Sequence, residues 1–157
     1  MVSIPSTAPG DAALIKPATW RDLNSVRQLE HVCFPKDVWP LWDLVGVLTF
    51  PNVIRLKAVD NGTLVGFIAA DLRPYENRAW IATVGVLPEY RRRGIGNALL
   101  EACEAQIQAP SIRLNVRISN QYAVRMYHMA GYQEVGIWPA YYEDGEGALV
   151  MEKVLSR

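Results

Sequence analysis

The chain has 157 residues, enough for one domain with a core of its own. Its 16 basic residues balance 16 acidic ones, so no overall charge points to a nucleic acid or a membrane surface as partner. The sequence shows no apolar run that could span a bilayer and no charged-then-apolar leader, so we expect a cytoplasmic protein. Cys33 and Cys103 lie in apolar helical patterns and are expected to be core thiols, although a disulfide between them is allowed.

The N-terminal part is expected to hold a tail, a strand and a capped helix. Residues 1–11 carry Ser, Thr, Pro and Gly with little to bury, so we expect a flexible tail followed by a single domain over residues 12–157. Residues 13–16 form a predicted short strand. Thr19 and Asp22 have the spacing of a capping box, so a helix is predicted to begin there.

The middle of the chain alternates apolar runs with turn residues. The first helix is predicted to end at Pro35, and residues 36–50 are predicted to contain a second, short helix. Residues 53–59 and 63–72 are predicted strands, because Asp60-Asn61-Gly62 between them is a strong hairpin signal. The remaining predicted elements are a strand over 78–86, a helix whose pattern is clear from Ala98, a strand over 112–116, a helix over 121–130, and strands over 132–138 and 148–154.

The segment after the strand at 78–86 has the composition of an anion site. Gly94 and Gly96 remove side chains, so several backbone N–H groups can close on one ligand. A helix N-terminus adds unpaired donors and partial positive charge, and Arg91-Arg92-Arg93 adds more. The expected ligand is a phosphate or pyrophosphate, although the segment matches neither the dinucleotide fingerprint nor the phosphate-loop pattern. The alternative is an ordinary basic loop.

Two signatures resemble those of the GNAT superfamily of acetyl-CoA-dependent N-acetyltransferases. Residues 91–96 match its Arg/Gln-x-x-Gly-x-Gly/Ala loop, and residues 114–132 match its strand, helix-opening asparagine, helical tyrosine and glycine–aromatic pair. Tyr141-Tyr142 and Phe34-Pro35 resemble features of the branch that contains the ribosomal-protein-alanine and protein N-α-acetyltransferases. The resemblance spans roughly residues 13–155. It implies the GNAT fold of the α/β (α+β) class, a mixed, mostly antiparallel sheet of six to seven strands flanked by about four helices.

The resemblance also implies acetyl-CoA as the cofactor and names no metal ligand. The pyrophosphate would lie on the backbone of residues 92–97, and the pantetheine arm along residues 84–86. Asn120 would contact that arm, although asparagine is also a good helix cap. Tyr127 would give its phenolic proton to the CoA sulfur; the alternative is a core aromatic residue. The implied cofactor-binding residues are Val84, Gly85, Val86, Arg91, Arg92, Arg93, Gly94, Ile95, Gly96, Asn97, Asn120 and Tyr127.

Two positions depart from the family's pattern. Asn115 stands where the branch usually carries Glu or His as general base, and an amide cannot accept a proton at neutral pH. Asn115 therefore stays a candidate catalytic residue only in orienting a water or holding the acceptor. Trp80 stands where some eukaryotic members carry a catalytic tyrosine. Residues that could replace the base, each also explicable as a surface group, are Glu30, His31, Glu143 and Asp144.

The acceptor site implied by the resemblance is largely aromatic. Its expected residues are Phe34, Pro35, Trp39, Trp80, Tyr141 and Tyr142. The alternative is that Trp39 and its neighbour Trp42 only pack the second helix, and that the tyrosines are ordinary hairpin residues.

These inferences together predict an enzyme that transfers acetyl directly from acetyl-CoA to the N-terminal α-amino group of a protein or peptide. Two alternatives stay open. One is an acetyltransferase for a small amine such as a polyamine, amino acid or antibiotic, and the other is a weakly catalytic CoA-binding regulatory module. A monomer or homodimer is expected, with no nucleic-acid or membrane partner.

Overall fold

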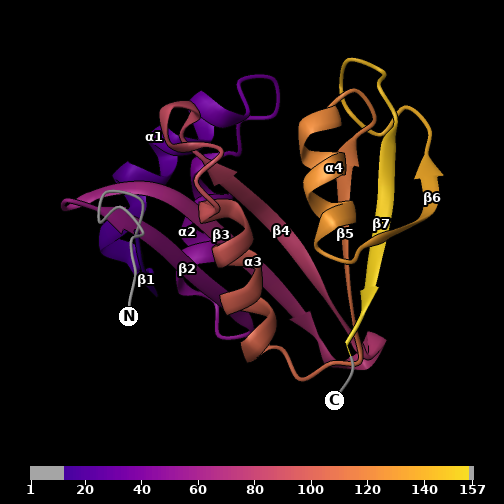
Figure 1. Ribbon diagram of the computed structural model, residues 1–157, viewed down its shortest axis with the longest axis horizontal. Helices are drawn as coiled ribbons and strands as arrows, with labels where there is room; N and C mark the ends of the chain where they lie inside the picture. Colours follow the sequence, from indigo (N-terminus) through magenta and orange to yellow (C-terminus); the bar gives the residue numbers. More distant parts are fainter. Residues whose placement is uncertain (1–12, 156–157) are drawn as a thin grey trace, which may run out of the picture. The chain divides into compact units, whose positions relative to one another are not determined.

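The computed structural model describes residues 13–155, so the tail predicted over residues 1–11 lies outside the described residues. The described chain forms a seven-stranded sheet with strand order β1-β2-β3-β4-β5-β7-β6 (Figure 1). Its elements are β1 (Leu14–Pro17), α1 (Leu23–Cys33), α2 (Leu41–Thr49), β2 (Val53–Asp60), β3 (Thr63–Arg73), β4 (Arg78–Val86), α3 (Ile95–Gln106), β5 (Ser111–Arg117), α4 (Gln121–Met129), β6 (Gln133–Trp138) and β7 (Ala148–Val154).

The sheet is mixed, as predicted. β1 pairs antiparallel with β2, and β7 pairs antiparallel with both β5 and β6. β4 and β5 are parallel, with Trp80 opposite Arg113. None of the helices in residues 13–155 has the length and apolar character that crossing a membrane requires.

The chain groups into two compact units. Within the described residues, the first unit consists of residues 13–69 and 83–106, and the second of residues 70–82 and 107–155. The single domain expected over residues 12–157 stays a prediction.

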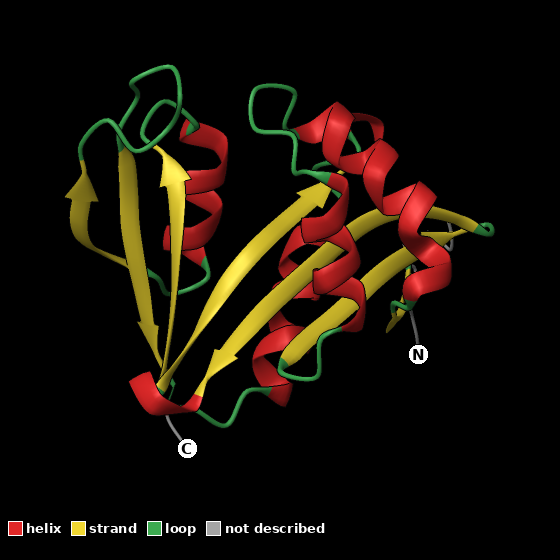
Figure 2. Ribbon diagram, turned by 180° about the vertical axis from the view of Figure 1, so that it is seen from behind, coloured by secondary structure: helices red, strands yellow, loops and turns green. Residues whose placement is uncertain are grey.

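In the first unit, helices cover both faces of the sheet (Figures 1 and 2). Phe67 and Ala69 of β3 belong to a buried apolar cluster with residues of α1 and α2 such as Leu29 and Leu44. Gly66 lies directly before Phe67 in sequence and faces α3, since a Cβ there would lie 3.0 Å from Leu99. Successive strand residues point to opposite faces, so β3 alternates between the two helical layers.

Local sequence signals account for the ends of these elements. Asn61 and Gly62 have positive φ angles of 50° and 79°, which a two-residue hairpin turn of this kind requires. Thr19 and Asp22 form the capping box, with the Thr19 N–H donating to an Asp22 oxygen at 2.8 Å. The capped segment first makes a short 3-10 turn (Trp20–Asp22), and α1 follows directly.

In the second unit, α4 covers one face of β5 and β7 (Figure 1). β7 is buried over its first four residues, whereas every residue of β6 is exposed at the edge of the sheet. A register shift between Glu134 and Gly136 interrupts the pairing of β6 with β7.

Candidate active site

The loop between β4 and α3 has the backbone geometry of an anion site. Arg92 and Gly94 both have left-handed backbones, with φ angles of 65° and 81°. A Cβ on Gly94 would meet nothing within 4 Å, so the backbone angle and not the space favours glycine there. Alternation of left-handed residues turns neighbouring N–H groups toward a common centre.

The start of α3 adds further donors to this loop. The Ala98 N–H donates to the Gly94 carbonyl at 2.9 Å. The N–H groups ahead of Ala98 in the first turn therefore have no partner inside the helix. α3 begins at Ile95 rather than at Ala98, where its apolar pattern becomes clear, because the left-handed Gly94 lets the chain enter the helix at once.

The three arginines of the loop are exposed. The Nε of Arg91 donates to the Val86 carbonyl at 2.9 Å, and a guanidinium nitrogen of Arg93 donates to the Glu89 carbonyl at 3.3 Å. Two of the three side chains are thus oriented by backbone carbonyls around the loop. Positive charge and converging N–H groups suit a phosphate-bearing ligand.

The end of β4 lies tightly against α1. A Cβ on Gly85 would lie 3.1 Å from Leu29, 3.2 Å from Phe34 and 3.3 Å from the Cys33 sulfur. Glycine at this position permits a close approach by side chains of α1 and its C-terminal cap. Phe34, expected in the acceptor wall, takes part in this packing.

Glu30 of α1 is buried against the same strand. Its side chain is 1 % exposed, and one carboxylate oxygen accepts a hydrogen bond from the Thr83 hydroxyl at 2.8 Å. Within residues 13–155, the other oxygen is buried without a hydrogen-bond partner. Burial raises the pKa of Glu30 to about 7, against a smaller lowering by Thr83.

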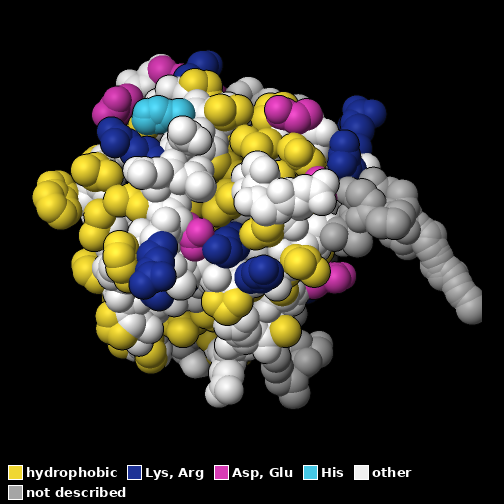
Figure 3. Space-filling model, turned by 90° about the vertical axis from the view of Figure 1, so that its left-hand side faces the viewer, with side chains coloured by type: hydrophobic (Ala, Val, Ile, Leu, Met, Phe, Trp, Pro, Cys, Tyr) yellow, Lys and Arg dark blue, Asp and Glu magenta, His cyan; other side chains and the backbone are white. Residues whose placement is uncertain are grey.

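The two tryptophans of the α1–α2 connection have different surroundings. Trp39 is partly buried and packs against the apolar cluster, which favours the packing interpretation for this residue. Trp42 is 78 % exposed. It belongs to a set of exposed hydrophobic residues on the N-terminal elements, and Figure 3 shows hydrophobic side chains gathered on that face. The set consists of Trp20, Val32, Val38, Leu41, Trp42 and Phe50.

In the second unit, Tyr127 lies on the buried face of α4. It is 6 % exposed, and its ring meets that of Tyr132 edge-on, with centroids 5.9 Å apart. Burial raises the pKa of Tyr127 well above its usual value, and Tyr142 raises it further. The phenol therefore keeps its proton at neutral pH and can act as a hydrogen-bond donor.

Asn120 caps α4. Its side-chain oxygen accepts from the Ala123 N–H at 3.2 Å, as a helix cap should. The expected contact of Asn120 with the cofactor arm stays a prediction.

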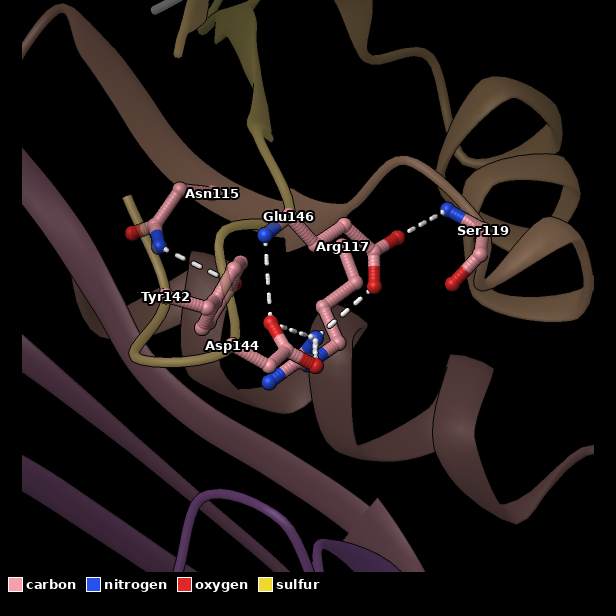
Figure 4. A network of polar contacts seen from close by, with 6 residues as sticks. All are labelled: Asn115, Arg117, Ser119, Tyr142, Asp144 and Glu146. Carbon is pink, nitrogen blue, oxygen red and sulfur yellow. Dashed lines mark hydrogen bonds and ion pairs between the residues drawn. The ribbon is translucent and has the colours of Figure 1, made fainter. Parts of the chain in front are cut away.

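Asn115 and the β6–β7 loop are joined by a polar network (Figure 4). The Asn115 amide nitrogen lies 3.4 Å from the Tyr142 hydroxyl, and the Arg117 guanidinium lies over the Tyr142 ring, 4.2 Å from its centroid. The same guanidinium contacts Asp144 at 2.9 Å and Glu146 at 2.7 Å. These contacts fix the loop that carries the paired tyrosines.

The contacts of this network also determine the roles of its two acidic residues, Glu146 and Asp144. Hydrogen bonds from Ser119 and Arg117 lower the pKa of Glu146 to about 2. Asp144 shares the Arg117 guanidinium and accepts from the Glu146 N–H at 3.1 Å, so it acts as a structural anion. His31 and Glu143 are exposed, as surface groups would be.

Aromatic residues of the second unit form a connected row. The ring centroids of Trp80 and Trp138 are 5.7 Å apart, those of Trp138 and Tyr141 5.2 Å, and those of Tyr141 and Tyr142 5.0 Å. The Trp80 indole also donates to Glu76 at 3.2 Å. Trp80, Tyr141 and Tyr142 were expected in the acceptor site, and the structure brings them together within one unit.

Two features of this arrangement were missed from the sequence. Trp138 gave no motif, although a tryptophan three residues before a double tyrosine is a signal. Arg117 was read only as part of the second signature. Glu30, one of the residues that the sequence offered as a replacement base, lies seven residues after Leu23 and three before Cys33, on the apolar stripe of α1. An acid at such a position is a signal of a buried polar role.

Comparison with known proteins agrees with these features. The family model of the acetyltransferase (GNAT) family matches residues 23–132. An uncharacterised N-acetyltransferase of Methanocaldococcus jannaschii is 33 % identical over 145 residues, covering 89 % of this chain and 90 % of its own. The N-alpha-acetyltransferase RimI of Mycobacterium tuberculosis is 31 % identical over 153 residues, covering 94 % and 96 %.

Solved structures of acetyltransferases have a similar fold. The ribosomal-protein-S18-alanine N-acetyltransferase of Escherichia coli superposes with a TM-score of 0.82 at 25 % identity, covering 93 % of this chain and 96 % of its own. An aminoglycoside 6'-N-acetyltransferase solved with coenzyme A has a TM-score of 0.79 at 18 % identity, covering 92 % and 98 %, which shows a shared fold.

Proposed function

Because the chain belongs to the acetyltransferase (GNAT) family, we propose that this acetyltransferase uses acetyl-CoA to acetylate the N-terminal α-amino group of a protein or peptide. The observation that carries the choice of acceptor is the fixed tyrosine pair, in which Tyr142 contacts Asn115 and is held by Arg117. The tyrosine hydroxyls of this loop and the Asn115 amide on β5 suit the hydrogen-bonding groups of a peptide backbone better than a compact polycation. The RimI relative, named an N-alpha-acetyltransferase, supports the same choice.

The β4–α3 loop is the proposed binding site for the cofactor's pyrophosphate. Its left-handed residues, Arg92 and Gly94, turn N–H groups together at the start of α3, and exposed arginines surround them. The pantetheine arm would then follow the backbone of residues 84–86. Bound acetyl-CoA supplies the activated acetyl group; the chain's own residues orient it and handle the protons.

Tyr127 is the proposed donor to the departing sulfur. Its raised pKa keeps the phenol protonated, so it can hydrogen-bond to negative charge as that charge develops. A neutral phenol can stabilise the negative charge that develops on sulfur while its own proton stays on the phenol oxygen.

The missing base at Asn115 is less damaging for an N-terminal amine than for a lysine. An α-amino group has a pKa of roughly 7.7–8.0, so about a fifth of it is neutral near pH 7.3. A lysine amine, with a pKa near 10.4, is neutral in only about one molecule in a thousand. This difference favours peptide N-termini as acceptors.

The test is free-thiol release from acetyl-CoA with three acceptor sets: short peptides with different N-termini, lysine peptides with blocked N-termini, and polyamines. Selective turnover of free N-termini is expected. Turnover of small amines alone would move the acceptor to that class, and tight CoA binding without any turnover would favour a regulatory module. The cytoplasmic location and the monomeric or homodimeric state stay predictions.

A further inference from the structure

We propose that Glu30 and Thr83 together accept the proton of the acceptor amine, with the Thr83 hydroxyl passing it to the Glu30 carboxylate. This inference rests on the proposed acetyl transfer and assigns the base that the chain lacks at Asn115. Both residues belong to the first unit, and neither has a role in the loop that would bind the pyrophosphate.

The first observation in support is the buried carboxyl group of Glu30, in which one oxygen lacks a hydrogen-bond partner among residues 13–155. One oxygen of Glu30 accepts from Thr83 at 2.8 Å, and among residues 13–155 the other finds no hydrogen-bond partner despite its burial. An unsatisfied buried polar group costs about 1–3 kcal/mol. A residue selected only for packing on the apolar face of α1 would avoid this cost, so the open oxygen points to a proton or a water as its partner during the reaction.

The second support is the position of Thr83 on β4. It directly precedes residues 84–86, the proposed track of the pantetheine arm. With the pyrophosphate at the loop after β4, an arm following the strand backwards would bring its thioester end toward Thr83. Gly85 lets α1 approach the strand closely, and Glu30 of α1 contacts Thr83 there.

The third support is the acid strength of the carboxyl. With its pKa raised to about 7 by burial, Glu30 exists as acid and carboxylate in similar amounts near neutral pH, the condition a general base needs. Cys33 on the same helix interacts with Glu30, and Arg91 interacts with Cys33. Residues of α2 and β3 in the adjoining cluster, such as Leu44 and Phe67, are apolar.

Every proton that moves in the proposed step has a donor and an acceptor. The ammonium form of the acceptor gives one proton to Thr83, which passes its own to the Glu30 carboxylate. The neutral nitrogen attacks the thioester carbonyl, so a C–N bond forms and the C–S bond breaks. The nitrogen then loses its second proton, the thiolate takes up one proton, and Glu30 later releases its proton to solvent.

The test compares wild type, Glu30→Gln and Glu104→Gln across pH, using the best peptide acceptor. Glu104 is a matched control, because it is also a buried acid but lies on α3. Glu30→Gln should lower kcat about 10²-fold, the lower end of what a positioned base contributes. The midpoint of kcat against pH should move from about 7 up to the pKa of the amine itself, roughly 7.7–8.0. Glu104→Gln should match wild type.

Infrared difference spectra between wild type and Glu30→Gln measure the carboxyl titration separately from that of the amine, and a midpoint near 7 is expected. A Glu30→Gln enzyme with wild-type kcat and an unchanged midpoint would overturn the proposal while leaving the acetyltransferase function intact. A wild-type enzyme without turnover on any amine would instead overturn the function itself.

A second pair of variants covers the case in which Glu30→Gln does not fold. Thr83→Val keeps the shape and removes the hydroxyl, whereas Thr83→Ser keeps the hydroxyl. The valine variant should lose activity about as strongly as Glu30→Gln, and the serine variant should retain it, with equal acetyl-CoA affinity and thermal unfolding checked for both. Equal activity of the two would contradict a proton path through Thr83.

Discussion

The amide nitrogen of Asn115 lies 3.4 Å from the hydroxyl of Tyr142, which joins the middle of β5 to the β6–β7 loop. An asparagine here works as a positioning group rather than a base. We expect Asn115→Ala to raise the KM of a peptide acceptor about fivefold, the equivalent of one ordinary hydrogen bond of about 1 kcal/mol. Its acetyl-CoA affinity should stay unchanged. A drop in kcat with constant KM would give Asn115 a role in the chemical step instead.

Arg117 should matter more than Asn115 for the shape of this loop. Arg117→Met leaves Asp144 and Glu146 without the guanidinium that they share and removes the contact with the Tyr142 ring. We expect the free energy of unfolding to fall by about 2 kcal/mol, as for other partly buried charges that lose a partner. Denaturant unfolding measures this, with Arg125→Met on the exposed face of α4 as control. Equal effects of both substitutions would contradict a structural role of the network.

Gly94→Asp should abolish acetyl-CoA binding, because it places a carboxylate and a strained left-handed residue in the proposed pyrophosphate site. Gly62→Asp is a matched control, since Gly62 has nearly the same φ angle and equally open surroundings in the β2–β3 hairpin. The two variants should lose similar stability, but only Gly94→Asp should lose cofactor binding in calorimetry. Unchanged affinity in Gly94→Asp would remove the pyrophosphate from this loop.

Tyr127→Phe should lower kcat about 10–100-fold and leave acetyl-CoA affinity within twofold, because the ring that packs against Tyr132 stays in place. Tyr132→Phe keeps the same aromatic pair and serves as control for packing. Stopped-flow thiol release separates the chemical step from product release. Full activity in Tyr127→Phe would make Tyr127 a core residue only.

The stability of the protein should depend on pH through Glu30. Burial raises the pKa of Glu30 from 4.5 to about 7, so the folded state holds a proton that the unfolded chain releases. This contribution is fully present below pH 4.5 and is lost as the pH rises through about 7. The loss amounts to about 3 kcal/mol, from about 1.36 kcal/mol per unit of pKa difference. Glu30→Gln should lack this dependence, which denaturant unfolding between about pH 5 and about pH 8 measures for both proteins. Parallel curves would show that Glu30 titrates normally.

Local signals in the sequence predicted much of the fold. The bounds of β4 and β7 match the prediction, and the Asn61-Gly62 hairpin was recognised because only certain residues tolerate its backbone angles. The start of α3 was placed too late, since a helix can begin on residues whose apolar pattern is not yet visible. Cys33 and Cys103 are both free thiols, as expected, and the disulfide that the sequence also allowed is not formed.

The candidate site was predicted less completely, because its contacts depend on register. Motifs pointed to Tyr127, Asn115 and the β4–α3 loop as isolated residues. The stacking of Trp80 on Trp138 joins β4 to β6, and the register shift between Glu134 and Gly136 changes which side of the sheet β6 side chains occupy. A period-two pattern cannot reveal a shift of this kind. The Glu30–Thr83 contact likewise needs the packing of α1 on β4, which no local pattern encodes.

The left-handed backbone of Arg92 has a consequence for how this protein could evolve. A non-glycine residue in that conformation costs about 1–2 kcal/mol, a noticeable part of the roughly 5–15 kcal/mol by which a domain is stable. Glycine would relieve the cost, so selection for thermostability alone would favour replacing the arginine. An arginine at a position where glycine would be less strained indicates that the positive charge of its side chain is needed. Homologues from hot environments would then keep arginine or lysine here and gain their heat resistance elsewhere in the chain.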